Sequence, residues 1–195
     1  MSDHDAFADR GRALEEDYFR KKDRELVEKM RRAAAAETER TEMGRTTGLS
    51  DPALLTELQD LGFTPETVSL LPFVPLIEVA WAEGGVTAAE RALIIELART
   101  RGIDESSAAG RRLNEWLESR PDAVVFDKAG RLIAAVLDSS AGRDKQGLTA
   151  DDLVAYSEKI AGASGGIFGT ALRSVTSEER ALLARIAGDL KGRKK

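Results

Sequence analysis

Residues 3 to about 40 contain no proline and a single glycine, Gly11. Proline and glycine are the residues that most disfavour a helix interior, and this segment is instead rich in the strong helix formers Ala, Arg, Lys and Glu. Opposite charges recur four residues apart, and each such pair stabilises an exposed helix by a few tenths of a kcal/mol. The pairs expected on this pattern are Glu16/Arg20, Asp17/Lys21, Glu25/Lys29 and Glu28/Arg32. The segment therefore predicts one long charged helix.

The apolar residues of this helix do not form one stripe. At about 100° per residue, Phe7, Leu14 and Tyr18 share one face. A second face, rotated by about 120° from the first, carries Phe19, Leu26 and Met30. A coiled coil keeps a single seam with a 3.5-residue period, which this pattern lacks. Such a helix suits a groove that contacts it from more than one side.

Composition excludes several classes of protein. Cysteine is absent and histidine occurs once, as His4, so thiol nucleophiles and most nucleophile–base pairs are missing. The net charge of −5 argues against general nucleic-acid binding. The start of the chain is acidic, unlike a secretory leader, and the longest apolar stretch, 68–82, is interrupted by prolines and Glu78. We expect a cytoplasmic protein with no membrane insertion and no cofactor.

Turn-forming residues divide the chain into three parts. Residues 1–40 form the exposed helix, and 41–50, with two glycines and three threonines, predict a linker. Residues 51–195 predict a compact multi-helix bundle, because no stretch alternates with the two-residue period of a strand. The most apolar segment, Phe73 to Glu83, is expected to be its central helix. The chain as a whole therefore predicts an all-α fold.

Helix starts in the bundle are marked by capping residues. Thr87-x-x-Glu90 and Thr176-x-x-Glu179 match the capping box, and Thr149-x-x-Asp152 resembles it. Asp104 and Asp122 are expected to cap two further helices. The octets 86–93 and 175–182 also resemble one another. This similarity indicates either a duplicated helical unit or two helix starts shaped by the same capping chemistry.

The bundle carries little sign of catalytic chemistry. No phosphate-binding G-x-x-x-x-G-K-[ST] motif is present, and the glycine-rich stretch 164–169 follows a helix and is interpreted as a hinge. Glu83 and Glu90 flank the Gly84-Gly85 turn and are weak candidates for binding a divalent cation; a helix cap and a solvated charge are the simpler interpretation. We predict no catalytic residues and therefore a protein that is not an enzyme.

The N-terminal helix carries a recognisable series of residues: Ala6-Phe7, Arg10, Ala13, Glu15-Glu16 and Tyr18-Phe19-Arg20, followed by Leu26, Met30, Arg31 and Arg32. This series resembles the inhibitory segment of the mitochondrial ATPase inhibitor protein. In that family the segment inserts as a helix between catalytic subunits of the F-type ATP synthase and blocks ATP hydrolysis. The resemblance implies that Glu15 pairs with an arginine of the catalytic subunit and that Phe7, Tyr18 and Phe19 are apolar anchors.

The same resemblance has limits that narrow what it implies. Gly11 lies inside the helix, Asp17 stands where the family is usually basic, and the family's histidine-rich coiled-coil half is absent. A pH switch of the kind found in that family is therefore not implied here. Homo-oligomerisation is compatible with these features.

The remainder of the chain, about Leu49 to Lys191, contains the segment 80–90, AWAEGGVTAAE, and a glycine-rich stretch before Val175-Thr176-x-x-Glu179. On these two features it resembles the tellurite-resistance TerB-like helical domains. It implies a fold more than an activity. Two functions remain open: a protein inhibitor of the ATP synthase, or a stress-response adaptor or metal-responsive module that uses the helix to recruit another partner. A carboxylate-based enzyme is the weakest alternative, because no spacing places an acid opposite a base.

Overall fold

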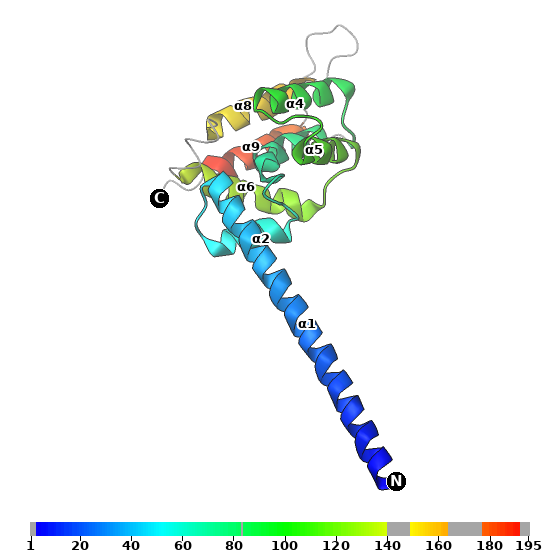
Figure 1. The fold of residues 1–195 in the computed structure, drawn as a ribbon. Helices are drawn as coiled ribbons and strands as arrows, with labels where there is room; N and C mark the ends of the chain where they lie inside the picture. Colours follow the sequence, from blue (N-terminus) through cyan, green and yellow to red (C-terminus); the bar gives the residue numbers. More distant parts are fainter. Residues whose placement is uncertain (1–2, 83, 140–148, 164–176, 192–195) are drawn as a thin grey trace. The chain divides into compact units, whose positions relative to one another are not determined.

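A computed structural model describes the backbone of residues 3–82, 84–139, 149–163 and 177–191, and the side chains of 15–82, 84–139, 149–163 and 180–190. Every regular element in these ranges is a helix, which confirms the all-α prediction (Figure 1). The chain divides into two units, Met1–Thr41 and Glu42–Lys195. In chain order the helices are α1 (Asp3–Thr47), α2 (Pro52–Asp60), the 3-10 helix η1 (Val68–Phe73), α3 (Val74–Ala80), α4 (Ala88–Thr100), α5 (Ala108–Glu118), α6 (Ala123–Asp138), α8 (Ala150–Ala163) and α9 (Ser177–Lys191).

The first unit is formed by α1 alone, which is the long charged helix that the composition predicts. Its ion pairs differ in detail from those expected. Glu28 pairs with Arg32 as predicted, but Arg20 pairs with Asp17 at 2.9 Å and Glu25 with Lys22 at 3.4 Å. Neighbours three residues apart compete with those four apart on a helix surface, and both spacings bring side chains together.

The prediction of a linker at 41–50 is wrong for most of its length, because α1 continues to Thr47. Met43 and Thr47 are buried in the second unit, so tertiary packing overrides the weak helix propensity of threonine and glycine. The Thr47 hydroxyl donates to the Met43 carbonyl at 2.8 Å and so remains satisfied. Gly48, with φ of 77°, ends the helix, and its N–H donates to the Gly44 carbonyl at 2.8 Å.

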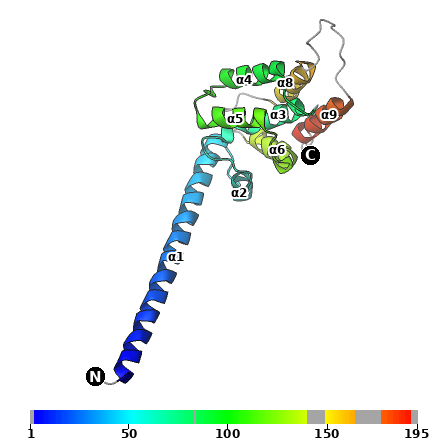
Figure 2. The ribbon, with the colours of Figure 1, turned by 90° about the vertical axis from the view of Figure 1, so that its right-hand side faces the viewer.

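The second unit is organised around the apolar segment at 68–80. The predicted helix from Phe73 to Glu83 is instead η1 followed by α3, which ends at Ala80, and Glu83 lies outside the described residues. Pro75 occupies the first turn of α3, where the missing N–H costs no hydrogen bond. Every residue of α3 except Glu78 is buried, and α3 contacts α4, α6, α8 and α9 (Figure 2).

Helix starts follow the capping residues with one exception. Thr87 and Glu90 form the predicted capping box of α4, and Asp122 caps α6 through a bond from the Val124 N–H. Thr149 and Asp152 exchange the same pattern of bonds at the start of α8. Thr176 and the glycine-rich stretch 164–169 lie outside the described residues.

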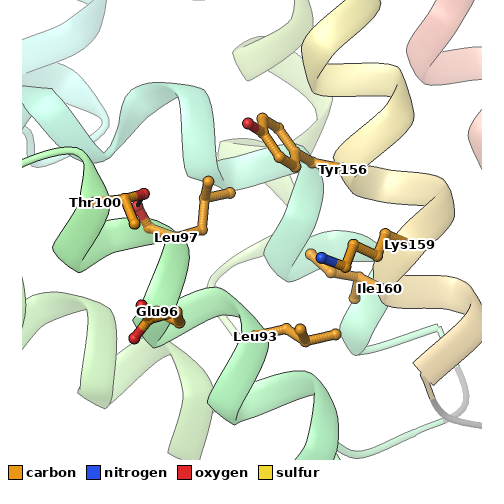
Figure 3. Close-up of a pocket in the computed structure, with 7 residues that line it drawn as sticks. All are labelled: Leu93, Glu96, Leu97, Thr100, Tyr156, Lys159 and Ile160. Carbon is orange, nitrogen blue, oxygen red and sulfur yellow. Dashed lines mark hydrogen bonds between the residues drawn. The ribbon is translucent and has the colours of Figure 1, made fainter.

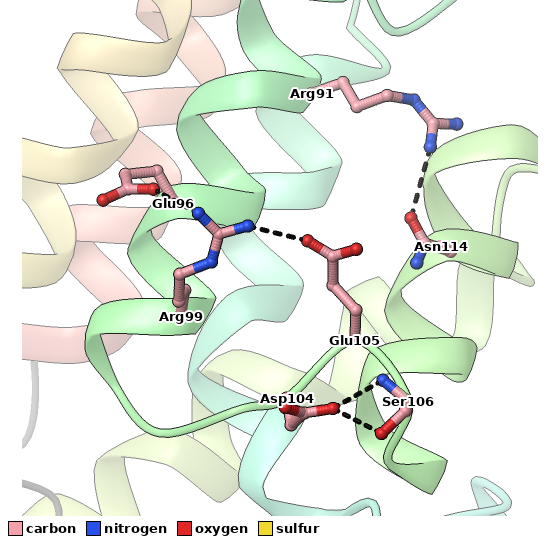
Figure 4. Close-up of polar contacts among 7 residues, drawn as sticks. All are labelled: Arg91, Glu96, Arg99, Asp104, Glu105, Ser106 and Asn114. Atoms are coloured by element: carbon pink, nitrogen blue, oxygen red, sulfur yellow. Dashed lines mark hydrogen bonds and ion pairs between the residues drawn. The ribbon is translucent and has the colours of Figure 1, made fainter.

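The exception is α5, which is capped by Ser107 and not by the predicted Asp104. Asp104 instead accepts a hydrogen bond from the Ser106 N–H at 2.8 Å and organises the turn before the helix (Figure 4). The bonds from the Ser106 hydroxyl and N–H hold the pKa of the Asp104 carboxyl below its ordinary value. Polar contacts then join α4 to the α5 region: Arg91 binds Asn114 at 3.3 Å, and Arg99 binds Glu105 at 2.9 Å.

Candidate functional site

The exposed surface of α1 is where the predicted partner-binding residues lie. Among the described side chains, six large hydrophobic residues are exposed, and five of them belong to α1. They are Tyr18, Phe19, Leu26, Val27 and Met30, with exposed fractions of 57, 61, 56, 46 and 63%. The sixth, Val124 of α6, stands alone. A cluster of this kind on an otherwise charged helix is typical of a binding surface.

These five residues, which we call the α1 apolar surface, cover a wide arc. At about 100° per residue, Tyr18 and Val27 mark its two edges about 180° apart, and the other three project between them. The rings of Tyr18 and Phe19 meet edge to face with centroids 5.8 Å apart, and the Lys22 ammonium lies 5.8 Å from the Tyr18 ring.

Val27 is the member that sequence reasoning missed. It is rotated by about 80° from Phe19, so it falls outside both of the faces defined by three-residue sets. The sequence nevertheless gave a reason to select Val27. β-branched residues lower helix propensity, so a valine on an exposed helix stands where a better helix former would make the helix more stable. Its exposure extends the face of Phe19, Leu26 and Met30 on the side away from Tyr18, so that the exposed apolar arc widens to about 180°.

The opposite side of the same segment carries charge. Arg20 and Arg32 are paired within the helix, whereas Lys21, Arg24 and Arg31 form no ion pair with any residue whose side chain the structure describes. This side is therefore net positive. Glu15 and Glu16 are also exposed and unpaired among the described side chains, so either carboxylate is available to a cationic partner residue. Phe7 and Arg10 lie in helical backbone, and their side chains fall outside the described set.

The weak metal candidates receive no support. Glu90 is 2% exposed, and one of its carboxylate oxygens accepts hydrogen bonds from the N–H and the hydroxyl of Thr87, both at 2.7 Å. It thus closes the capping box, as the simpler interpretation of this residue expected. Within the described part of the chain, no three His, Cys, Asp or Glu side chains come close enough to hold a metal ion.

A second surface feature lies between α4 and α8, where a cavity of about 230 Å³ opens to solvent (Figure 3). Its floor is apolar and its rim is polar. The floor is formed by Leu93, Leu97 and Ile160, and the rim by Glu96, Thr100, Tyr156 and Lys159. Sequence reasoning did not select these residues, because α4 and α8 are about sixty positions apart and only the fold brings them together.

Comparison with known proteins returned no match to any family model, to any curated protein or to any solved structure. Across the described residues, no helix is both long enough and apolar enough to cross a membrane. Inferences about function therefore rest on the surface of this chain and on the two resemblances stated above.

Proposed function

We propose that this chain is a non-enzymatic, protein-binding regulator that acts through α1. The observation that carries the proposal is the concentration of exposed apolar side chains at Tyr18–Met30. Aromatic and long aliphatic side chains that a partner can desolvate are the usual centres of binding energy at protein interfaces. An arc of about 180° fits a groove that surrounds half of the helix better than a flat surface.

The target we propose is the catalytic head of an F-type ATP synthase, whose ATP hydrolysis the helix inhibits. Support comes from the register of Glu15, Tyr18 and Phe19, which matches the inhibitory segment of the mitochondrial inhibitor family. In the structure all three side chains are exposed, and Glu15 has no ion-pair partner among the described side chains. An arginine of the partner could therefore pair with the Glu15 carboxylate without first breaking an ion pair within this chain.

The net-positive side of α1 defines a second requirement for this partner. Lys21, Arg24 and Arg31 would face carboxylates that border the groove, or solvent. Complementary charge of this kind mainly accelerates association and is screened by salt. Inhibition that develops more slowly at higher ionic strength would therefore support an acidic border.

The direct experiment measures ATP hydrolysis by a purified catalytic head as the full chain is added. We expect inhibition by the wild-type chain, and at least tenfold weaker inhibition by the double variant Glu15→Ala, Tyr18→Ala. Val124→Ala, at the exposed apolar residue of α6, is the matched control and should inhibit like the wild type. Absence of inhibition at tens of micromolar, a limit of about −7 kcal/mol in binding free energy, would overturn the proposed target.

The alternative is an adaptor of the TerB-like class that recruits a different protein through the same surface. A pull-down with the wild-type chain and the same double variant distinguishes the two functions. Specific capture of another protein, lost in the double variant, together with unaffected ATP hydrolysis, would identify the adaptor.

A further inference from the structure

Residues 18–32 of α1 form a basic segment within an acidic chain. The segment contains seven arginines and lysines and three acidic residues, which gives it a net charge of +4, whereas the whole chain carries −5. Every side chain of the segment is exposed. The same segment contains all five residues of the α1 apolar surface. Positive charge and exposed apolar side chains therefore occur together along about 22 Å of helix.

Met30 marks the middle of the apolar side of this segment. At about 100° per residue, Phe19, Leu26 and Val27 all lie within about 60° of Met30 around the helix axis. Tyr18 lies farther round, about 120° from Met30. A tyrosine suits the edge of an apolar surface, because its ring is apolar and its hydroxyl can remain in contact with polar groups.

Basic side chains border the apolar side in both directions. Lys22 and Arg20 each lie about 80° from Met30, one on either side of it. Lys29 and Arg31 each lie about 100° from Met30, again on opposite sides. We call Arg20, Lys22, Lys29 and Arg31 the basic borders. They place two rows of positive charge along the helix with the apolar side chains between them.

Two of the three acidic residues of the segment project away from the apolar side. Glu25 and Glu28 lie about 140° and 160° from Met30. The third, Asp23, lies only about 20° from Met30 and forms no ion pair with any side chain that the structure describes. The order around the helix is thus apolar, basic and then acidic, with Asp23 as the exception.

This order matches the layers of an anionic lipid bilayer. A helix that lies along a bilayer buries its apolar side by about 5–10 Å, which is roughly half of a helix diameter of about 10–12 Å. Lysine and arginine at the level of the surface cover apolar groups with their stems and bring their charges to the lipid phosphates. Acidic residues on the far side remain in water.

We infer that residues 18–32 of α1 bind along the surface of an anionic phospholipid bilayer, with Met30 toward the acyl chains and the basic borders on the lipid phosphates. The inference goes beyond the proposed function, because it assigns a second partner to the α1 apolar surface. One surface cannot be covered twice, so the bilayer and a protein partner exclude each other. Membrane binding would then regulate how much of the chain is available to that partner.

Sedimentation of the full chain with phospholipid vesicles tests this inference. We expect binding to phosphatidylglycerol vesicles, and at least about tenfold weaker binding to neutral phosphatidylcholine vesicles. Added salt should weaken the binding, because it screens the attraction between the basic borders and the lipid. Lys29→Gln, Arg31→Gln should raise the half-saturating concentration of phosphatidylglycerol at least about tenfold. The matched control Lys128→Gln, Lys159→Gln removes the same charge from the second unit and should stay within about twofold of the wild type.

The orientation of the helix is tested with single fluorescent labels. The chain has no cysteine, so Met30→Cys and Glu28→Cys each accept one polarity-sensitive label. The label at position 30 should shift to the blue on phosphatidylglycerol vesicles, whereas the label at position 28 should remain in water. Asp23→Asn should strengthen vesicle binding more than Glu28→Gln does, because only Asp23 is brought to the anionic surface.

Three results would each overturn the inference. They are equal binding to neutral and anionic vesicles, equal loss of binding in the border variant and its control, and a label at position 30 that stays in water. The vesicle experiments contain no ATP synthase and the hydrolysis experiment contains no lipid. Failure of membrane binding is therefore distinguishable from failure of the proposed function.

Discussion

Glu78 of α3 and Arg185 of α9 form an ion pair across 107 positions of sequence. The Glu78 side chain is only 13% exposed, whereas Arg185 is 41% exposed and also lies 3.7 Å from Asp189 on its own helix. Burial raises the pKa of the Glu78 carboxyl above its ordinary value of 4.5, and the charge of Arg185 opposes that shift without cancelling it. Asp127 adds to the rise and Arg120 reduces it.

A raised pKa means that the folded chain holds the Glu78 proton to higher pH than the unfolded chain does. The stability contributed by Glu78 is thus fully present below its unfolded pKa and is lost as pH rises through the folded value. Glu78→Gln resembles the protonated acid at every pH. We expect the free energy of unfolding of Glu78→Gln, minus that of the wild type, to increase from pH 4.5 to pH 7 in urea denaturation. A decrease over this range would show that Arg185 outweighs burial.

Removing the arginine tests the same pair from the other side. In Arg185→Gln the buried Glu78 carboxylate loses the strongest influence that favours its charged form. We expect this variant to be destabilised more at pH 7 than at pH 4.5, since only the charged carboxylate needs the partner. Equal destabilisation at both pH values would mean that Arg185 acts through packing of its aliphatic stem.

The end of α1 belongs to the second unit, which predicts where a stable fragment begins. Met43 is fully buried and Leu49 is 7% exposed, so a fragment that starts at residue 51 lacks both core side chains. We expect a fragment of residues 42–195 to be more stable than one of 51–195 by at least about 2 kcal/mol, the loss typical of one large core side chain. Urea denaturation followed by circular dichroism measures the difference. Equal stability of the two fragments would place the start of the folded unit at residue 51, as the sequence analysis predicted.

Two helical glycines predict opposite effects of the same substitution. A Cβ on Gly110 would lie 2.2 Å from the Asp104 carbonyl oxygen and 2.7 Å from the Cα of Glu105, so Gly110→Ala forces the turn away from α5. A Cβ on Gly188 of α9 meets nothing within 4 Å. We expect Gly110→Ala to cost about 1–3 kcal/mol and Gly188→Ala to stabilise by up to about 1 kcal/mol. Thermal unfolding of both variants checks the difference in sign.

The α1 apolar surface is expected to contribute to binding without contributing to stability. Phe19 and Met30 are each more than 60% exposed, so replacing them with serine removes little buried area. We expect the double variant Phe19→Ser, Met30→Ser to change the free energy of unfolding of the second unit by less than about 0.5 kcal/mol. The double variant should lower the affinity for a partner bound through α1. Val27→Ala, which shortens another exposed side chain of the same surface, should lower that affinity as well. Loss of stability in the double variant would assign these residues to folding.

Local chemistry explains which parts of the fold were predictable. The long helix followed from thirty-eight positions with almost no breaker, and the starts of α4, α6 and α8 followed from capping residues that act within a few positions. The linker at 41–50 was wrong because the burial of Met43 depends on packing partners far along the chain. Asp104 was predicted to cap α5, but aspartate and serine are both favourable N-cap residues. Only the folded geometry of the turn shows that Ser107 is the cap and that Asp104 accepts from the Ser106 N–H.

The residues of the candidate sites also divide into those that the sequence predicts and those that only the fold brings together. The exposure of Tyr18, Phe19, Leu26 and Met30 was predictable because an isolated helix leaves its side chains where its period puts them. Val27 needed a measure of exposure for each residue. Tyr156 and Lys159 line one cavity with Leu93 and Leu97 only because α8 packs beside α4 in the folded unit, and the helical periodicity of neither segment predicts that packing.

The exposed part of α1 obtains its order from its own sequence, and this has a thermal consequence. Nearly every described side chain from Glu15 to Ala35 is exposed, so helix propensity and short-range ion pairs are the main terms that hold the segment helical. Helices stabilised in this way melt gradually as temperature rises, without a sharp transition. Binding through α1 would then require re-forming lost turns, so affinity should weaken on warming long before the second unit unfolds. Loss of helix in the exposed part of α1 and unfolding of the second unit are then two separate thermal events, the first gradual and the second cooperative.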